Sequence, residues 1–307
     1  MTVAAAPRTW DHRHLLDVEG LSRGELERVC DLAVEMREAR AARDNRSMLE
    51  AETVGLAFYE PSTRTRVSFE LAAKALGATT VDLVVAASSV EKGESLVDTA
   101  RTLERTGVTT LVLRHQSAGA PQVVARATGM RIVNAGDGAH AHPTQALADL
   151  LTLREALGPL DGRLITIVGD VVHSRVARSN IHALTSVGAR VRVAGPRGWV
   201  ADFEGWPGVE ISTTLTDGLR GADAVMALRV QLERGVQLIG EAADWRLDSE
   251  RMEMAAPGAP ILHPGPTNEG VEITSELANG PRSLIGRQVE NGVPVRMAVL
   301  ALLAGAA

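Results

Sequence analysis

The chain has 307 residues, a length typical of about two globular domains. It is 45% hydrophobic, 23% charged and 3% aromatic, a composition ordinary for a soluble globular protein whose cores are built from Ala, Val and Leu. The formal net charge is 32 − 38 = −6, which gives no general reason to expect a nucleic acid or an anionic membrane as partner, so any bound anion must be held by a local cluster of positive charge.

The N-terminal segment and the single cysteine bear on location. Met1–Trp10 contains one arginine and a Val-Ala-Ala-Ala run that is too short for the apolar core of a signal peptide. No apolar stretch approaches the roughly 20 residues that a membrane-spanning helix needs. Cys30 cannot form an intrachain disulfide, and its helical sequence context predicts a core position. We therefore expect a cytoplasmic protein with no membrane partner.

Short apolar segments alternate with amphipathic ones along the chain. The predicted strands are Val54–Tyr59, Thr79–Val84, Thr109–Arg114 and Arg131–Asn134 in the first half, and Leu164–Val168, Arg190–Ala194, Ala224–Arg229 and Pro260–Leu262 in the second. The clearest helices are Val67–Leu76, followed by Gly77, and Gln145–Leu157, followed by Gly158. Near-continuous apolar strands separated by helices indicate parallel sheets covered on both faces. We predict an α/β protein with two similar doubly wound domains, each with a mainly parallel sheet flanked by helices.

The boundary between the two domains is expected at the helix Gln145–Leu157 and the Pro-Leu-Asp-Gly turn that follows it. We assign residues 1–144 to the first domain and residues 145–290 to the second. The final helix, Val295–Leu303, is apolar nearly all round and must be buried. We expect residues 291–307 to complete the first domain. Ligands of parallel sheets bind at the carboxyl ends of the strands, and the informative polar residues of this chain follow its strands.

The segment Phe58–Glu70, which reads F-Y-E-P-S-T-R-T-R-V-S-F-E, predicts an anion site. A buried strand stops at Pro61, and a helix begins within Ser62–Thr65. The first N–H groups of a helix lack internal acceptors, and the macrodipole places its positive end there. A lone S-T-R would more simply be a helix cap and a solvated basic turn. Three hydroxyls and two arginines within five residues favour a phosphate pocket instead.

This segment carries a family resemblance that continues through the chain in the right order. The chain resembles the aspartate/ornithine carbamoyltransferase family, whose carbamoyl phosphate motif is the S-T-R-T-R segment at Ser62–Arg66. The resemblance implies that the first domain binds carbamoyl phosphate and the second binds L-aspartate. It assigns to carbamoyl phosphate the residues Ser62, Thr63, Arg64, Thr65, Arg114, His142, Gln145, Gly265 and Pro266.

Two further segments of the first half surround the carbamoyl group in this resemblance. Arg114 ends a predicted strand and, in isolation, is more simply a surface charge, but the family places an arginine here against phosphate and carbonyl oxygen. His142 precedes Pro143 at a helix start, and Gln145 projects from the same face. In the family the imidazole donates to the carbonyl oxygen and the glutamine binds the amide nitrogen. Asp149 follows in the A-L-x-D position and is interpreted as structural.

Ser88–Leu96 is a polar loop between a predicted strand and a helix, and its residues alone indicate a solvated loop. In relatives its K-G-E motif reaches into the active site of the neighbouring subunit. The resemblance therefore implies that Ser88 and Lys92 of an adjacent subunit complete each site. It also implies a homotrimer whose activity requires the assembly.

The second half supplies the implied amino-acid end of the site. Arg175 lies at a helix start and Arg229 at the end of a predicted strand, and either one alone is more simply a surface residue. A forked guanidinium suits bidentate carboxylate binding, and Gln231 and Glu233 would orient Arg229 or the substrate. The implied aspartate-binding residues are Lys92, Arg175, Arg229 and Gln231. No G-x-G-x-x-G is present, so a dinucleotide cofactor is not expected.

The turn His263–Pro266 reads H-P-G-P and is rigid whatever its function. In the family its carbonyls accept from the carbamoyl NH₂ and from the attacking amine. Two positions depart from the commonest family pattern: Glu269 stands where a basic residue is frequent, and Ala141 where a longer polar residue is usual. These departures bear on the geometry of the loops and not on the reaction class.

The implied reaction is attack of the aspartate α-amine on the carbonyl of carbamoyl phosphate. It gives N-carbamoyl-L-aspartate and phosphate, a step of de novo pyrimidine biosynthesis. Negative charge develops on the carbonyl oxygen, where fixed donors stabilise it. The implied catalytic residues are Arg64, Thr65, Arg114 and His142. Neither a metal nor another cofactor is expected, because the nearest approach to a ligand cluster, Asp137, His140 and His142, uses a histidine that has another task.

Two alternatives are weaker. A carbamoyltransferase of the ornithine type would carry a cysteine in an H-C-L-P turn to receive a basic amino acid, and this chain has H-P-G-P. A non-catalytic relative that only binds carbamoyl phosphate would lack at least one of Arg64, Arg114, His142 and Lys92, and all are present. No residue pattern points to a regulatory chain or a pathway-enzyme partner.

Overall fold

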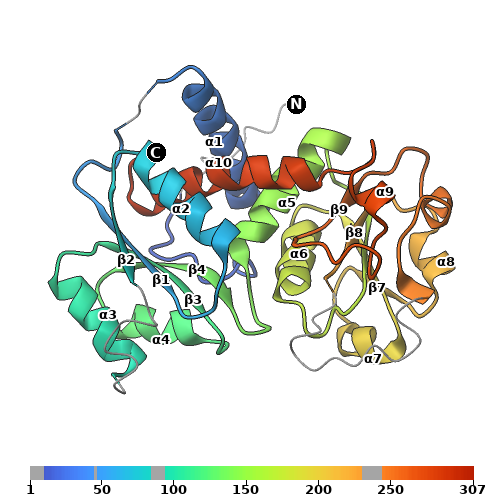
Figure 1. The fold of residues 1–307 in the computed structure, drawn as a ribbon, viewed down its shortest axis with the longest axis horizontal. Helices are drawn as coiled ribbons and strands as arrows, with labels where there is room; N and C mark the ends of the chain where they lie inside the picture. Colours follow the sequence, from blue (N-terminus) through green and yellow to red (C-terminus); the bar gives the residue numbers. More distant parts are fainter. Residues whose placement is uncertain (1–9, 45–46, 84–93, 230–243) are drawn as a thin grey trace, which may run out of the picture. The chain divides into compact units, whose positions relative to one another are not determined.

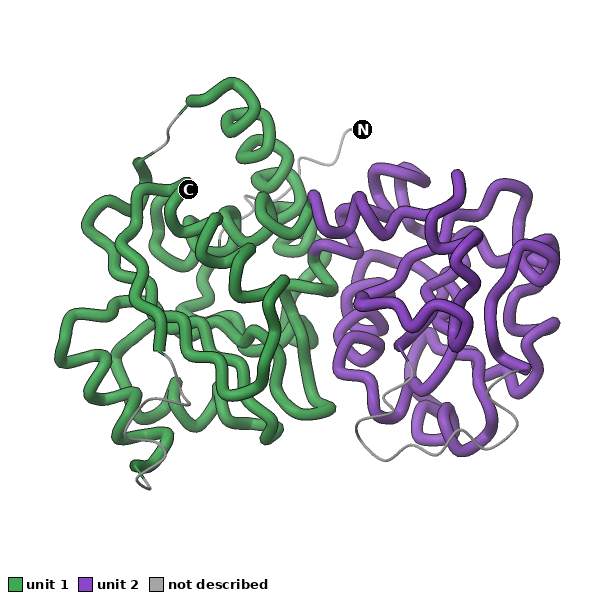
Figure 2. Tube along the Cα trace, in the orientation of Figure 1, with its two compact units in different colours: residues 1–147, 291–307 green, residues 148–290 purple. Residues whose placement is uncertain are grey.

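The structure, a computed structural model, describes residues 10–44, 47–83, 94–229 and 244–307. The chain divides into two compact units, residues 1–147 with 291–307 and residues 148–290, drawn in two colours in Figure 2. Each unit contains one parallel sheet with helices on both faces (Figure 1). The predicted α/β class with two doubly wound domains is confirmed.

The elements follow one another in the order that Figure 1 labels. Unit 1 contains α1 (Arg23–Ala41), β1 (Thr53–Phe58), α2 (Thr63–Ala75), β2 (Thr79–Leu83), α3 (Leu96–Arg105), β3 (Thr110–His115), α4 (Ala120–Ala127) and β4 (Arg131–Asp137). Unit 2 contains β5 (Leu164–Val168), α6 (Arg175–Ser186), β6 (Arg190–Ala194), α7 (Arg197–Val200), η3 (Ala201–Phe203), β7 (Val209–Ser212), α8 (Leu215–Leu219), β8 (Ala224–Ala227), η6 (Arg251–Met254), β9 (Ile261–Leu262) and α9 (Ser275–Ala278). The chain passes from unit 1 to unit 2 along α5 (Pro143–Leu157) and returns along α10 (Ile285–Leu303).

The sheet of unit 1 has the strand order β2-β1-β3-β4, and all its pairs are parallel. Helices α3 and α4 cover one face, and α1, α2 and α10 cover the other (Figure 1). The register sets Phe58 against Arg114 and His115 against Asp137. Because parallel strands end at the same edge, the segments that follow β1, β3 and β4 start side by side, which is where ligands of such sheets bind.

Helix α2 begins at Thr63, inside the predicted start at Ser62–Thr65 and one turn before the apolar periodicity, which begins at Val67. Its first turn is polar, so the apolar periodicity of the sequence does not reach it. Ser62, whose backbone is extended with φ −160°, is the last residue before the helix. The end of the helix requires Gly77, whose φ is +84° and whose added Cβ would lie 3.3 Å from the Cα of Ser47.

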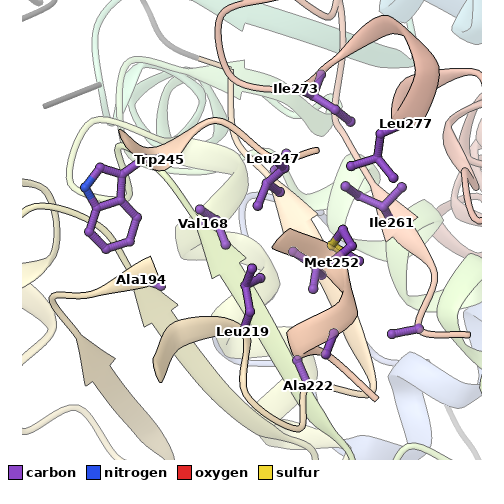
Figure 3. Packing of buried hydrophobic residues seen from close by; sticks show 14 of the residues in the cluster. Val168, Ala194, Leu219, Ala222, Trp245, Leu247, Met252, Ile261, Ile273 and Leu277 are labelled. Atoms are coloured by element: carbon purple, nitrogen blue, oxygen red, sulfur yellow. The ribbon is translucent and has the colours of Figure 1, made fainter. Parts of the chain in front are cut away.

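The sheet of unit 2 has the order β7-β6-β5-β8-β9, again all parallel. Strand β7 was not predicted, because it is a four-residue edge strand, V-E-I-S, in which only two residues are apolar. The predicted strand Ala224–Arg229 ends at Ala227, so Arg229 lies in the segment after the strand. A buried apolar cluster supports this sheet: Figure 3 shows Val168 and Leu219 beside the segments that carry Trp245 and Met252.

Helix α10 is buried without interruption from Asn291 to Leu303, which confirms the predicted burial of its last turns. The guanidinium of Arg37 on α1 donates from Nη1 to Asn291 Oδ1 at 2.8 Å, so a polar bond ties the two helices inside unit 1. Cys30 is buried in α1, as predicted. Among the described residues, no helix is both long enough and apolar enough to cross a bilayer.

Candidate active site

The start of α2 has the geometry of an anion site. Its first intrahelical bond runs from Arg66 N to Ser62 O at 3.1 Å, so the amides of residues 63–65 have no acceptor within the helix. The Ser62 hydroxyl does not cap an amide and instead donates to Thr65 Oγ1 at 3.0 Å. Thr65 is buried, Thr63 and Arg64 are exposed, and the first turn contains no acidic residue. The positive end of the helix dipole therefore meets hydroxyls and a guanidinium and no carboxylate within that turn.

Arg114 lies at the end of β3, beside the segment that leads into α2. Its guanidinium is buried and donates from Nη2 to Glu60 Oε1 at 2.5 Å and from Nη1 to Ala135 O at 3.2 Å. The backbone amide of Tyr59 donates to Arg114 O at 2.9 Å, which continues the strand register to the sheet edge. Glu60 comes two residues before Ser62 in the sequence. These bonds fix a forked cation at the same edge as the α2 start.

The end of β4 is organised by the carboxylate of Asp137, which has no exposed surface. It accepts from Gly119 N at 2.8 Å, Asn134 Nδ2 at 2.8 Å and Ala141 N at 3.1 Å, and His140 Nδ1 lies 3.0 Å from Oδ2. Burial by itself would raise the pKa of Asp137, but these hydrogen bonds outweigh it and hold the pKa below its ordinary value. The same bond from Asp137 raises the pKa of His140.

His142 follows this turn and precedes α5. Its carbonyl accepts from Gln145 N at 3.1 Å, which confirms the helix start expected at H-P-T-Q. The imidazole is 5% exposed. Gly138 has a φ of +48°, and an added Cβ would lie 2.8 Å from Ala118 N, so the path from Asp137 to His142 has no space for a side chain there. The backbone of the turn therefore determines where the imidazole lies.

Unit 2 repeats this arrangement at the end of β5. Asp170 is 1% exposed, and its Oδ1 lies 2.9 Å from His173 Nδ1. The chain then enters α6, where the Ser174 hydroxyl caps the helix by accepting from Ala177 N at 3.2 Å. Arg175 is the first helical residue and is 6% exposed. The two units thus share a motif. In unit 1, Asp137 and His140 precede α5, which begins just after His142; in unit 2, Asp170 and His173 precede α6, which begins at Arg175.

Arg229 lies two residues beyond the end of β8 and is half-buried. Leu228 N donates to Val168 O at 2.8 Å, so the β8–β5 pairing extends to the residue before Arg229. The turn His263–Pro266 follows β9, and its Gly265–Pro266 peptide bond is cis.

Four of the predicted residues, Ser88, Lys92, Gln231 and Glu233, lie outside the described residues. Within the described part of the chain, no group of three or more His, Cys, Asp or Glu side chains is arranged to hold a metal ion.

Comparison with protein families matches almost the whole chain. Residues 13–155 match the carbamoyl-phosphate-binding domain, and residues 161–303 the Asp/Orn-binding domain, of aspartate/ornithine carbamoyltransferase. The chain belongs to this family of carbamoyltransferases. The resemblance that the sequence motifs predicted is therefore confirmed.

Individual carbamoyltransferases agree with the family match. The chain is 50% identical to the aspartate carbamoyltransferase catalytic subunit of Gluconacetobacter diazotrophicus, over 99% of this chain and 97% of that one. It superposes with a TM-score of 0.84 and 31% identity on aspartate transcarbamoylase from Trypanosoma cruzi in complex with N-(phosphonacetyl)-L-aspartic acid, with 94% of each chain covered. Ornithine carbamoyltransferase from Pyrococcus furiosus gives a TM-score of 0.87 at 28% identity, covering 95% of this chain and 97% of that one.

Within this carbamoyltransferase, the structure pairs Arg114 with a residue to which the sequence assigned no role. Glu60 is part of the quoted segment, but its contact with Arg114 depends on the strand order β1-β3, which no local pattern reveals. Asp137 was considered only as a metal ligand, whereas the structure makes it the acceptor that holds the turn before His142. The sequence feature that could have indicated this role is the position of Asp137 at the end of a strand, shortly before His140 and His142.

Proposed function

We propose that this protein transfers the carbamoyl group of carbamoyl phosphate to the α-amine of L-aspartate, giving N-carbamoyl-L-aspartate and phosphate. The observation that carries the proposal is the near full-length identity of 50% to a protein named aspartate carbamoyltransferase catalytic subunit. The anion geometry at the start of α2 supports it independently. We further propose that unit 1 binds carbamoyl phosphate and unit 2 binds aspartate, in line with the two family domains that match them.

The phosphate would bind at the start of α2. Its oxygens would accept from the amides of residues 63–65 and from the hydroxyls of Ser62, Thr63 and Thr65. Arg64 would add a second source of positive charge. These interactions would strengthen as the phosphate takes up charge on leaving, which is the condition for catalysis rather than mere binding.

The carbonyl oxygen would be stabilised by Thr65, Arg114 and His142. Thr65 lies in the first turn of α2 and Arg114 at the end of β3, and both are buried, so their donors are fixed before the substrate arrives. Gln145, in the first turn of α5, would bind the carbamoyl nitrogen together with carbonyls of Gly265 and Pro266. Orientation of the two substrates would supply much of the remaining acceleration, because no covalent intermediate is needed.

Aspartate would be held by Arg175 and Arg229, one for each carboxylate. Arg175 combines a buried guanidinium with a position at the start of α6, where the helix dipole also favours an anion. Gln231 would orient Arg229 or the substrate, and Lys92 would contribute from the adjacent subunit.

We also propose a homotrimer in which Ser88 and Lys92 of one subunit complete the site of the next. An apolar patch supports a second copy as the partner of unit 1: Val67 and Leu71 on α2 and Val81 on β2 are 39%, 43% and 40% exposed. The bond from Arg66 Nη1 to Asp82 Oδ2, 2.6 Å long, joins these two elements. Strand β2 leads directly into residues 84–93, which contain both predicted shared residues. Burial of such a patch is typical of interfaces between subunits.

The cellular context follows from the reaction. N-carbamoyl-L-aspartate is the product expected in de novo pyrimidine biosynthesis, and a cytoplasmic location is consistent with the single buried cysteine. The reaction as proposed uses the two substrates and no cofactor.

The test is an acceptor assay with carbamoyl phosphate and the purified protein. L-aspartate should give N-carbamoyl-L-aspartate and an equal amount of phosphate, while L-ornithine should give no citrulline above the blank. Ornithine is the alternative to exclude because the fold is equally close to an ornithine enzyme. Citrulline formation with ornithine, or phosphate release that is independent of both amino acids, would contradict the proposal.

A further inference from the structure

A continuous path of hydrogen bonds runs through the interior of unit 2 and ends at the turn His263–Pro266. We call it the turn network; its members are Asp149 on α5, Asn180 on α6, His263, Glu272 and Gln288 on α10. None of these residues is more than 6% exposed. A buried polar group that loses its partner costs about 1–3 kcal/mol, so each bond of such a network constrains the next.

The first part of the turn network is oriented by the carboxylate of Asp149. Asn180 Nδ2 donates to Oδ2 at 2.8 Å, and Gln288 Nε2 donates to Oδ1 at 2.7 Å. Gln288 then accepts at Oε1 from His263 N at 2.9 Å. The amide of Gln288 has only one acceptable orientation, since a flip would set its oxygen against the carboxylate and its NH₂ against an N–H. The backbone at the start of the turn is thereby fixed.

The second part of the turn network uses the ring of His263. Its Nδ1 accepts from Gly265 N at 2.8 Å, so the ring proton of the neutral imidazole is on Nε2. Nε2 faces Glu272 Oε1 at 3.1 Å, and the same oxygen accepts from Asn268 N at 2.6 Å. The imidazole and the carboxylate together tie a residue inside the turn to one just after it.

We propose that Glu272 and Gln288 are positioning residues for carbamoyl transfer, acting by holding the backbone of the turn His263–Pro266 from its two sides. The inference rests on the proposed function, which places carbonyls of this turn against the carbamoyl nitrogen and the attacking amine. Asn180 lies on the same helix as Arg175, so the turn network also ties the turn to the helix that carries a candidate aspartate ligand.

Enzyme kinetics distinguish a network that only stabilises the fold from one that positions the turn for the reaction. Loss of stability alone reduces the amount of folded enzyme but leaves the Michaelis constant of the folded fraction unchanged. Displacement of the turn changes kcat and the aspartate KM of the folded enzyme, because a misplacement of 1 Å at the reacting atoms can lower the rate about 100-fold. Phosphate binding at the start of α2 in unit 1 should not change, since none of the network residues belongs to that unit.

The experiment compares Glu272→Leu with Glu272→Gln in the full-length protein. The leucine removes the acceptor for His263 and Asn268, whereas the glutamine removes the charge but keeps an oxygen in the same place. We expect kcat/KM for aspartate to fall roughly 10- to 100-fold in E272L and to stay close to wild type in E272Q. The inhibition constant of inorganic phosphate, which reports the α2 site, should be the same in all three proteins.

A second variant, Gln288→Met, removes the acceptor of the hydrogen bond from His263 N while keeping the length of the side chain. It should reproduce the E272L pattern, and the double variant should lose less than the product of the two separate losses, because both act on one turn. Folded E272L and Q288M proteins with wild-type kcat and aspartate KM would overturn the inference. A wild-type protein that makes no N-carbamoyl-L-aspartate would instead contradict the proposed function, so the two failures are distinguishable.

Discussion

The carboxylate of Glu60 lies 2.5 Å from Nη2 of Arg114, at the edge of the sheet where β1 and β3 end. The guanidinium is 10% exposed and the carboxylate 23%, so the pair is largely shielded from water. Arg114 is the cation that the proposed function assigns to the carbonyl oxygen and that the family resemblance also places against the phosphate. An internal anion therefore balances this cation in the ligand-free protein, and a phosphate must share it or replace it.

Glu60→Gln should make the ligand-free protein less stable and more responsive to phosphate. The substitution removes a charged partner of Arg114, at a cost of about 1.5–3 kcal/mol in the free energy of unfolding. Bound phosphate would supply the missing negative charge, so its stabilising effect should be larger than in the wild type. Thermal unfolding with and without inorganic phosphate measures both quantities. An identical phosphate-induced rise in Tm for the two proteins would show that Arg114 does not meet the anion.

Arg114→Lys keeps the charge and loses the fork of donors. If Arg114 stabilises the developing oxyanion, kcat should fall by roughly 100- to 1,000-fold, the range for loss of one such donor. Arg131→Lys is the matched control, because Arg131 forms a half-buried ion pair with Glu52 at the opposite edge of the same sheet, where β1 and β4 begin. Initial rates of phosphate release at saturating substrates measure the effect. Equal losses in R114K and R131K would contradict the assignment.

The Asp137–His140 pair should make stability depend on pH. Its hydrogen bond raises the pKa of His140 above the ordinary 6.5, so the stability from this pair is fully present below pH 6.5 and is lost as the pH rises through the raised pKa. Asp137 has a lowered pKa, so its contribution is lost only in acid, as the pH falls through that lowered value. In His140→Gln, the Tm deficit relative to wild type should therefore be largest near pH 6 and shrink toward pH 8 and above.

An Asp137→Asn background provides the control for this pH dependence. There the largest cause of the raised His140 pKa, the hydrogen bond to Asp137, loses its charge, so the Tm change caused by His140→Gln should vary much less between pH 6 and 8. Other histidines, such as the half-buried His115, whose partial burial lowers its pKa, are present in both proteins of each comparison, so their titration cancels. In the protein that retains Asp137, a Tm deficit of His140→Gln that does not vary between pH 6 and 8 would show that the Asp137–His140 pair does not make stability depend on pH.

Mixed trimers of Arg64→Ala and Lys92→Ala should regain activity. Each variant alone should be inactive, because every site lacks either its own arginine or the neighbour's lysine. After subunit exchange at equal amounts, about a quarter of the sites should combine an intact Arg64 with an intact Lys92. Phosphate release before and after exchange measures the recovery, and mass spectrometry verifies that hybrids formed. Verified hybrids without recovered activity would exclude a site shared between subunits.

The sequence predicted the parts of the fold that depend on apolar periodicity. The core strands and the buried end of α10 were identified because they are nearly continuous apolar runs. Strand β7 was missed because V-E-I-S is short and half polar, and the sheet pairing that makes it a strand comes from β6, distant in the sequence. The start of α2 within Ser62–Thr65 was predicted from the strand end and the hydroxyl and arginine residues there, because the apolar periodicity of the helix begins only at Val67.

The candidate site was predictable where one segment contains both the strand end and the chemistry. Ser62–Thr65 is such a segment, and family motifs identified the others. Contacts between distant segments were not predictable, because they depend on strand order and register. Glu60 with Arg114 and Gln288 with His263 are examples, separated by 54 and 25 residues in the sequence.

The most direct test of the account is a crystal structure of the protein with carbamoyl phosphate bound. We expect phosphate oxygens within about 3 Å of the amides of residues 63–65 and a guanidinium nitrogen of Arg114 at a similar distance from the ligand. A ligand bound elsewhere, with the start of α2 empty while the same preparation converts aspartate to N-carbamoyl-L-aspartate, would contradict it.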